Sequence, residues 1–142
     1  MRPDEFFRCE GLCKTQDSRI VFSENKSTYE ALNPKKKDTC RIRIDGSLIR
    51  ENVMKCDYGL WVDDGKMILI ELKGSDVVHA LEQLSNTHRI LLENYKGWQF
   101  RYWYRIVSAK VPKPNLISRT KTMRKLQGID VKIKSRRLVE EI

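Results

Sequence analysis

The sequence lacks any apolar run of the length that a bilayer-crossing helix needs. Its first residues, Met1 to Lys14, mix Arg2, Asp4, Glu5 and Arg8 among apolar side chains, unlike the apolar segment of a signal peptide. We therefore expect a soluble, cytoplasmic protein with no membrane partner. The length of 142 residues suits one hydrophobic core, so we expect a single domain over 1–142.

Cysteine is scarce and is not arranged in the C-x-x-C pairs typical of metal sites. Four cysteines are too few for a disulfide scaffold in a chain of this length, and they are Cys9, Cys13, Cys40 and Cys56. A four-thiolate zinc or iron–sulfur site is an alternative, although the spacing of Cys9 and Cys13 matches it loosely. The simpler interpretation is that these residues are small buried hydrophobes.

Acidic residues are scarce in the last third of the chain. Residues 1–100 hold 16 Lys/Arg and 16 Asp/Glu, whereas residues 101–142 hold 12 Lys/Arg and 3 Asp/Glu, so the whole net charge of +9 lies in this basic C-terminal third. Such a surface suits a polyphosphate because each bound cation releases a condensed counterion, although a solvated basic surface explains the charge equally well. The candidate nucleic-acid-binding residues are Arg119, Lys121, Arg124, Lys125, Lys132, Lys134, Arg136 and Arg137.

The pattern of apolar residues and turn signals predicts an α/β fold in which a central mixed sheet is flanked by helices. The expected helices cover 3–13, 77–95 and 119–126, and the expected strands cover 18–22, 40–44, 47–50, 58–62, 66–73, 100–109 and 129–134. Residues 23–38 are expected to form an irregular loop, and Asp45-Gly46 is expected to join 40–44 and 47–50 as a hairpin. The strands 58–62 and 66–73 are apolar on both faces, which predicts the covered centre of the sheet.

The loop between these two central strands decides whether their charged residues meet. If Asp63-Asp64-Gly65 is a three-residue loop with Gly65 left-handed, Val62 pairs with Lys66 and Asp57 pairs with Glu71. Opposed residues share one face of a hairpin, and Lys73 follows Glu71 on that face. A two-residue loop would place Asp57 opposite Leu72 and separate the charges.

Two carboxylates close together repel each other unless a proton or a cation lies between them. Hard oxygen ligands favour Mg²⁺ or Mn²⁺, and a magnesium ion held by one or two carboxylates keeps waters that can attack a phosphodiester. A lysine beside them would stabilise the charge that builds on the phosphoryl oxygens or orient the attacking water.

Asp57, followed by Glu71-Leu72-Lys73 at the end of the next strand and then by a helix, resembles the PD-(D/E)XK nuclease superfamily over about residues 40 to 95. The resemblance implies a restriction-endonuclease-like core in which Asp57, Glu71 and the Leu72 carbonyl bind the metal and Lys73 is catalytic. It also implies a catalytic glutamine on the helix, for which Gln83 is the candidate. An acidic residue on the first helix would complete the site, and either Glu10 or Glu30 fits this role. Cys56 stands where the family usually has proline.

We therefore expect a Mg²⁺-dependent endonuclease that hydrolyses phosphodiester bonds of DNA, or less readily of RNA. A protein of this size that cuts both strands of a duplex would work as a homodimer. Two alternatives stay open: a catalytically inactive member of the fold that binds nucleic acid or a partner protein, for example in host–phage conflict or repair, and a small basic subunit of a larger assembly.

Overall fold

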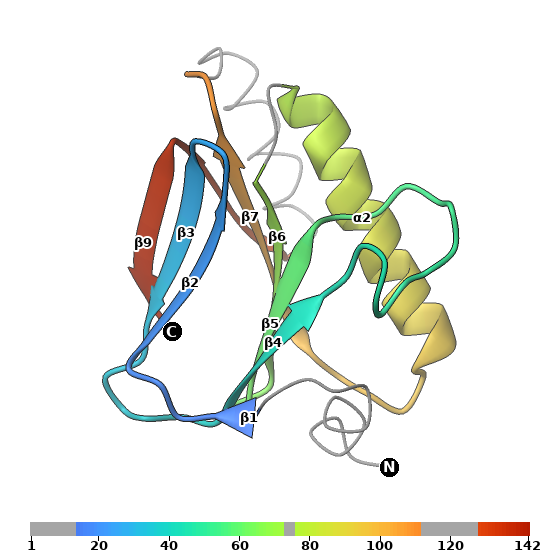
Figure 1. Cartoon of the computed structure of the whole chain (residues 1–142). Coiled ribbons are helices and arrows are strands. Elements are labelled where there is room, and N and C mark those ends of the chain that lie inside the picture. Colours follow the sequence, from blue (N-terminus) through green and yellow to red (C-terminus); the bar gives the residue numbers. More distant parts are fainter. Residues whose placement is uncertain (1–13, 73–75, 112–127) are drawn as a thin grey trace.

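The computed structural model describes residues 14–72, 76–111 and 128–142. Within these ranges the chain forms one helix and nine strands (Figure 1). Their bounds are β1 Lys14–Thr15, β2 Arg19–Glu24, β3 Ser27–Leu32, β4 Thr39–Arg43, β5 Tyr58–Val62, β6 Lys66–Glu71, α2 Val77–Asn94, β7 Arg101–Ser108, β8 Asp130–Ser135 and β9 Arg137–Glu141. Neither the expected helix at 3–13 nor the one at 119–126 lies within the described residues.

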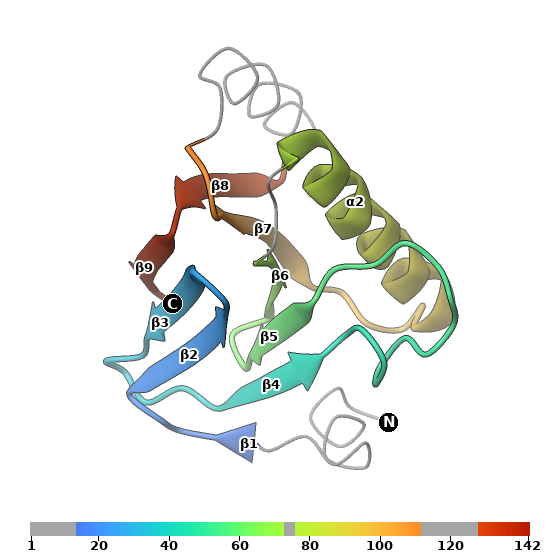
Figure 2. The same cartoon turned by 45° about the horizontal axis from the view of Figure 1, so that its top comes forward.

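The larger sheet is mixed, with strand order β1-β4-β5-β6-β7-β8. Neighbours from β1 to β6 pair antiparallel, whereas β6, β7 and β8 run parallel. Two parallel neighbours need a crossover, and α2 provides it between β6 and β7 (Figure 2). A second sheet of order β2-β3-β9 combines a β2–β3 hairpin with a parallel β9. The α/β class is therefore as the sequence predicts.

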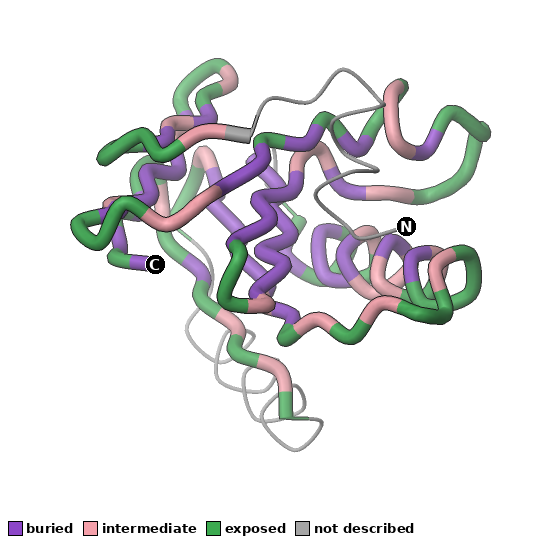
Figure 3. The backbone as a smooth tube through the Cα atoms, turned by 90° about the horizontal axis from the view of Figure 1, so that it is seen from below, coloured by how far each residue is buried: buried purple, intermediate pink, exposed green. Residues whose placement is uncertain are grey.

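Each face of the larger sheet is covered. The face toward α2 packs Met67 and Leu69 against Leu81 and Leu84, and the opposite face packs Ile68 and Ile70 with side chains of the smaller sheet. All six residues of β6 are buried, which confirms that this strand lies at the covered centre (Figure 3). Within the described part of the chain, helix covers one face of the larger sheet and the smaller sheet covers the other.

The structure differs from the sequence-based prediction in two segments. Residues 23–38 contain the strand β3 as well as a loop. The charge of Glu30 made this strand hard to predict, but in the structure Glu30 forms ion pairs with Arg19 and Arg137. Residues 47–50 do not return as a strand beside β4, whose neighbours are β1 and β5. The chain turns tightly there because the Leu48 N–H donates to the Arg43 carbonyl at 3.0 Å.

The helix α2 and the strands that follow it agree with the sequence pattern. Asp76 caps the helix by accepting a hydrogen bond from the His79 N–H at 3.1 Å, and the Tyr95 N–H closes its last turn on the Leu91 carbonyl. The expected strands 100–109 and 129–134 are β7 and β8, within one residue at each end. No helix in the described residues is long and apolar enough to span a membrane.

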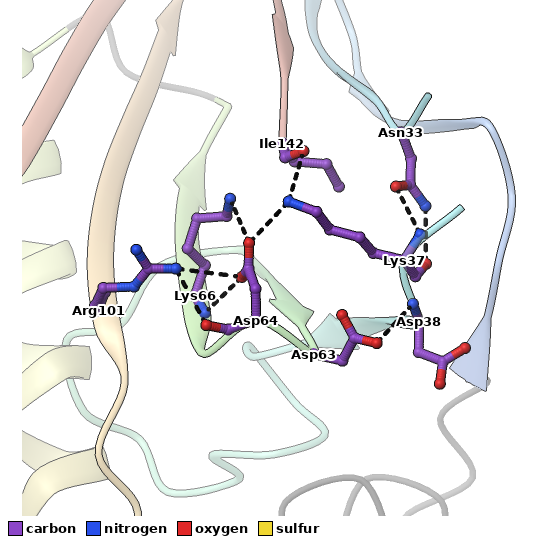
Figure 4. A network of polar contacts seen from close by, with 8 residues as sticks. All are labelled: Asn33, Lys37, Asp38, Asp63, Asp64, Lys66, Arg101 and Ile142. Atoms are coloured by element: carbon purple, nitrogen blue, oxygen red, sulfur yellow. Dashed lines mark hydrogen bonds and ion pairs between the residues drawn. The ribbon is translucent and has the colours of Figure 1, made fainter. Parts of the chain in front are cut away.

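The β5–β6 loop has the three-residue form. Val62 pairs with Lys66, Gly65 has a φ of +97°, and the Gly65 N–H donates to the Val62 carbonyl at 3.0 Å. Asp64 fixes this loop from several directions (Figure 4). Its carboxylate accepts from Lys37 and Lys66, each at 2.9 Å, and lies 3.5 Å from Arg101.

Burial raises the pKa of Asp64, but hydrogen bonds from Lys37 and Lys66 outweigh this effect and lower the pKa to about 2. The Lys37 ammonium also donates to the Ile142 carbonyl at 3.2 Å, so the chain end is tied to the same cluster. The loop that sets the register is therefore held by three cations from three separate segments.

Candidate metal and catalytic site

The hairpin register brings Asp57 opposite Glu71. The ladder of paired residues runs from Val62 and Lys66 to Tyr58 and Ile70, and the next pair along it is Asp57 and Glu71. Both residues alternate in step with Trp61 and Met67, so they point to the side of the sheet that α2 covers. The condition that the sequence set for this pair is confirmed.

The two carboxylates differ in their surroundings. Asp57 is half-buried, and its Oδ2 accepts a hydrogen bond from the Leu72 N–H at 3.1 Å. Glu71 is only 3% exposed, and its buried Oε1 has no hydrogen-bond partner among the described residues. A buried oxygen in this state is costly unless something else satisfies it.

The pKa of Glu71 is raised well above its usual value of 4.5. Burial contributes most, followed by the hydrogen bond to Asp57 and the negative charge of Asp57. The pair therefore retains a proton where two separate carboxyls would have lost theirs. A divalent cation satisfies the same requirement by balancing the charge and filling the free coordination position at Oε1.

The donor set fits a small hard cation, although it is sparse. Asp57 and Glu71 supply carboxylate oxygens, and the backbone of Leu72 is adjacent because its N–H donates to Asp57. Within residues 14–72, 76–111 and 128–142, no group of three or more His, Cys, Asp or Glu side chains converges on one point. Mg²⁺ keeps several waters and needs only one or two carboxylates, so the pair meets its requirement.

Gln83 lies where α2 faces the acid pair. Its side chain forms a hydrogen bond with Glu71 that lowers the pKa of that carboxyl, against the larger effect of burial. Its Nε2 also donates to the Lys55 carbonyl at 3.1 Å. The structure thus brings the predicted Gln83 to the site and gives it a second bond to the segment before Asp57.

Two further helix residues hold the segment that leads into Asp57. The Thr87 Oγ1 accepts from the Cys56 N–H at 2.9 Å and donates to the Gln83 carbonyl at 2.8 Å. Asn86 donates to the Met54 carbonyl. We did not predict these positioning residues, although Gln83, Asn86 and Thr87 follow a three- and four-residue spacing that places them on one side of the helix.

The Cys56 thiol is a buried packing group. It is fully enclosed, burial raises the pKa of the thiol, and its Sγ donates to the Tyr58 carbonyl at 3.6 Å. Cys40 is buried in the same core cluster. Both agree with the interpretation as small hydrophobes, and Cys9 and Cys13 lie outside the described residues.

The structure also places several other predicted site residues. Glu30 lies in β3 of the smaller sheet, not on a first helix, and its carboxylate contacts Arg19 and Arg137, so it does not complete the acid pair. Lys73 and Glu10 lie outside the described residues, and their predicted roles stay predictions. His88 is half-buried, its Nδ1 lies 2.8 Å from the Tyr104 hydroxyl, and its ring stacks on Tyr102.

The predicted basic residues divide into two kinds. Lys132 in β8 is ion-paired with Glu140 in β9 at 3.1 Å, which joins the two sheets, and Arg137 in β9 is ion-paired with Glu30 in β3 at 2.8 Å, which joins two strands of the smaller sheet. Lys134 and Arg136 are exposed. The remaining four lie outside the described residues and are Arg119, Lys121, Arg124 and Lys125.

Comparisons with models of known protein families, with curated proteins and with solved structures found no match to this chain.

Proposed function

We propose that the chain is a Mg²⁺- or Mn²⁺-dependent nuclease with a restriction-endonuclease-like core. The observation that carries this proposal is the opposed acid pair, in which Glu71 is buried, has a raised pKa and keeps one oxygen without a partner among the described residues. A buried carboxylate pair is unfavourable for folding alone, and such perturbed groups gather at functional sites. The mixed sheet, with α2 following the Glu71 strand, is compatible with that core.

In this proposal Asp57 and Glu71 hold the ion, and the Leu72 carbonyl adds a third oxygen, as the sequence resemblance implies. The ion would supply Lewis-acid stabilisation of the phosphoryl charge and would favour ionisation of the attacking water. Thr87 and Gln83 fix the backbone before Asp57, so the Asp57 carboxylate keeps its orientation. Lys73 would stabilise the charge on the non-bridging oxygens.

The proposed substrate is nucleic acid, with DNA favoured over RNA. The excess of 12 basic over 3 acidic residues beyond residue 100 supports a polyanionic partner. Cutting of both strands of a duplex would require two copies of the site, which favours a homodimer for that activity.

The test incubates purified protein with plasmid, single-stranded DNA and RNA, each with Mg²⁺, Mn²⁺ or EDTA. We expect cleavage that requires a divalent ion and that falls by about 100-fold or more in Glu71→Gln and Lys73→Ala. Glu51→Gln, an isosteric change at an exposed carboxylate in the loop before the site, is the matched control and should retain activity.

Cleavage that is absent with every ion, or unchanged in Glu71→Gln, contradicts the proposal. Calorimetry with Mn²⁺ on the wild type and on Asp57→Ala then distinguishes the nuclease from the alternative of a catalytically inactive protein that only binds nucleic acid or a partner protein. A binding-only protein would take up no ion at this pair and would bind nucleic acid equally well without Asp57.

A further inference from the structure

The turn between β8 and β9 joins three strand ends through one residue, Arg136. The Arg136 N–H donates to the Ser108 carbonyl at the end of β7 at 2.7 Å, and the Arg136 carbonyl accepts from the Thr28 N–H at the start of β3 at 2.8 Å. Its φ of +64° lies in the left-handed region, which is unfavourable for arginine. Glycine would fit this backbone better, so the arginine at this position is maintained against a local cost.

Four exposed cations surround this junction: Lys26, Lys110, Lys134 and Arg136. Lys26 comes two residues before Thr28, Lys110 two residues after Ser108, and Lys134 two residues before Arg136. We call these four residues the cationic corner. None of them has an ion pair or a side-chain hydrogen bond with any residue in the described ranges.

The neighbouring cations behave differently. Lys132 and Arg137 lie within four residues of Arg136 along the chain, and each is paired with a glutamate of the smaller sheet. Lys132 and Arg137 each have a carboxylate partner, whereas no ion pair among the described residues involves the four cations of the cationic corner. Like charges that lie close together repel each other, so a bound polyanion would stabilise this surface relative to its unbound state.

The cationic corner lies at the same end of the larger sheet as the acid pair, because β6, β7 and β8 run parallel and end at Glu71, Ser108 and Ser135. Glu71 pairs with Ile106 on the parallel neighbour β7, and Ser108 follows two residues later. From the strand spacing and rise, the Cα atoms of Glu71 and Ser108 are roughly 8 Å apart. This separation is comparable with the spacing of a few successive phosphates, so one nucleic-acid strand can reach both places.

We infer that the cationic corner binds the phosphate backbone of a nucleic-acid strand within a few nucleotides of the phosphodiester that lies at the acid pair. The position relative to the cut rests on the proposed function, whereas the binding itself does not. A phosphate backbone fits better than an acidic protein because its charges repeat at a spacing that several cations can meet together.

The test compares two double variants of equal charge change. Lys110→Glu with Lys134→Glu alters the cationic corner, and Lys35→Glu with Lys36→Glu alters two exposed lysines in the loop after β3, beyond the opposite end of that strand. Affinity for labelled single-stranded DNA and duplex is measured by fluorescence anisotropy in EDTA from 50 to 200 mM salt.

We expect the corner variant to lose about tenfold or more in affinity at 100 mM salt and its salt slope to fall by about 1.5 to 2, since two phosphate contacts are lost. The control variant should stay within about twofold of the wild type in affinity, because its lysines make no phosphate contact. Arg136→Gly should weaken binding without lowering the melting temperature, because glycine relieves the left-handed backbone. That result separates loss of charge from loss of fold.

Equal weakening in both double variants, no binding by the wild type, or equal competition by polyglutamate of matched charge would overturn the inference. If the wild type binds through the cationic corner but never cuts, the binding inference stands and the nuclease proposal fails. If the wild type cuts and the corner variant binds with unchanged affinity, the nuclease proposal stands and the binding inference fails.

Discussion

The two ends of the β5–β6 hairpin carry similar acidic residues in opposite states. At the loop end, the Asp64 carboxylate contacts Lys37, Lys66 and Arg101. At the open end, Glu71 lies against Asp57, and one of its oxygens has no partner in the described part of the chain. The pKa of Asp64 is lowered and the pKa of Glu71 is raised.

Asp64 is therefore a carboxylate that stabilises the fold, whereas Glu71 is one whose burial is unfavourable for folding. Paired charges at the loop end fix the register, and the register is what opposes Asp57 and Glu71 at the other end. Stability at one end of the hairpin therefore maintains an unfavourable arrangement at the other. Such local conflicts in an otherwise consistent fold are expected at functional sites.

Among the changes considered, Thr87→Val should have the largest effect, because it removes a hydrogen bond that holds the segment before Asp57, at the open end of the hairpin, and leaves the loop end unchanged. The Cys56 N–H would lose its acceptor in a buried place, which costs about 1–3 kcal/mol of unfolding free energy. We also expect Mn²⁺ affinity to fall by about tenfold, as for other changes behind a metal ligand. Urea denaturation and calorimetry measure the two effects.

Thr87→Ser is the matched control because it keeps the hydroxyl. It should recover most of the Mn²⁺ affinity even where its lost methyl group lowers stability. If the serine and valine variants bind Mn²⁺ equally, Thr87 has no positioning role and contributes packing alone.

Asp64→Asn tests the loop end. It weakens three contacts to cations, and we expect a loss of about 1–2 kcal/mol at pH 7 after allowing for solvent screening. Asp63→Asn is the control, because Asp63 accepts one exposed hydrogen bond, from the Asp38 N–H at 3.2 Å. The loss at Asp64 should clearly exceed the loss at Asp63 in urea denaturation at 0.1 M salt.

The acid side of the stability profile gives a second readout of Asp64. Its folded pKa of about 2 lies below the ordinary value of 3.8, so its contribution is present above pH 3.8 and is lost as the pH falls toward 2. The wild type and Asp64→Asn should therefore converge in stability across that window. Parallel profiles would show that the contacts of Asp64 do not depend on its charge.

The open end was largely predictable because its signals are local. Gly65 after two aspartates set the loop, the loop set the register, and the helix pattern after Gly74 was regular. Thr87 escaped prediction because its partner, the Cys56 N–H, is 31 residues away and has no side-chain signature.

The expected strand 18–22 is β2 of the smaller sheet, but β3 and β9 escaped prediction because their charges are satisfied only at long range. Glu140 in β9 accepts from Tyr29, which lies 111 residues earlier, and from the fully buried Arg105. A strand with glutamates at inward positions resembles a solvated loop until these partners are known. The same long-range pairing explains why charge alone could not separate Lys132 and Arg137, which form ion pairs between strands, from Lys134 and Arg136, which form none with the described residues.

Glu71→Gln should have the smallest effect on stability and the opposite sign to Asp64→Asn. The folded pKa of Glu71 is raised, so wild-type stability falls as the pH rises above 4.5, where the unfolded chain ionises this group and the folded chain does not. Glutamine has no such ionisation. In EDTA at pH 8 the variant should be more stable than the wild type, and the difference should vanish below pH 4.5. Denaturation at several pH values tests this directly. A variant less stable than the wild type at pH 8 would mean that Glu71 is a structural carboxylate like Asp64, and the distinction between the two ends of the hairpin would not hold.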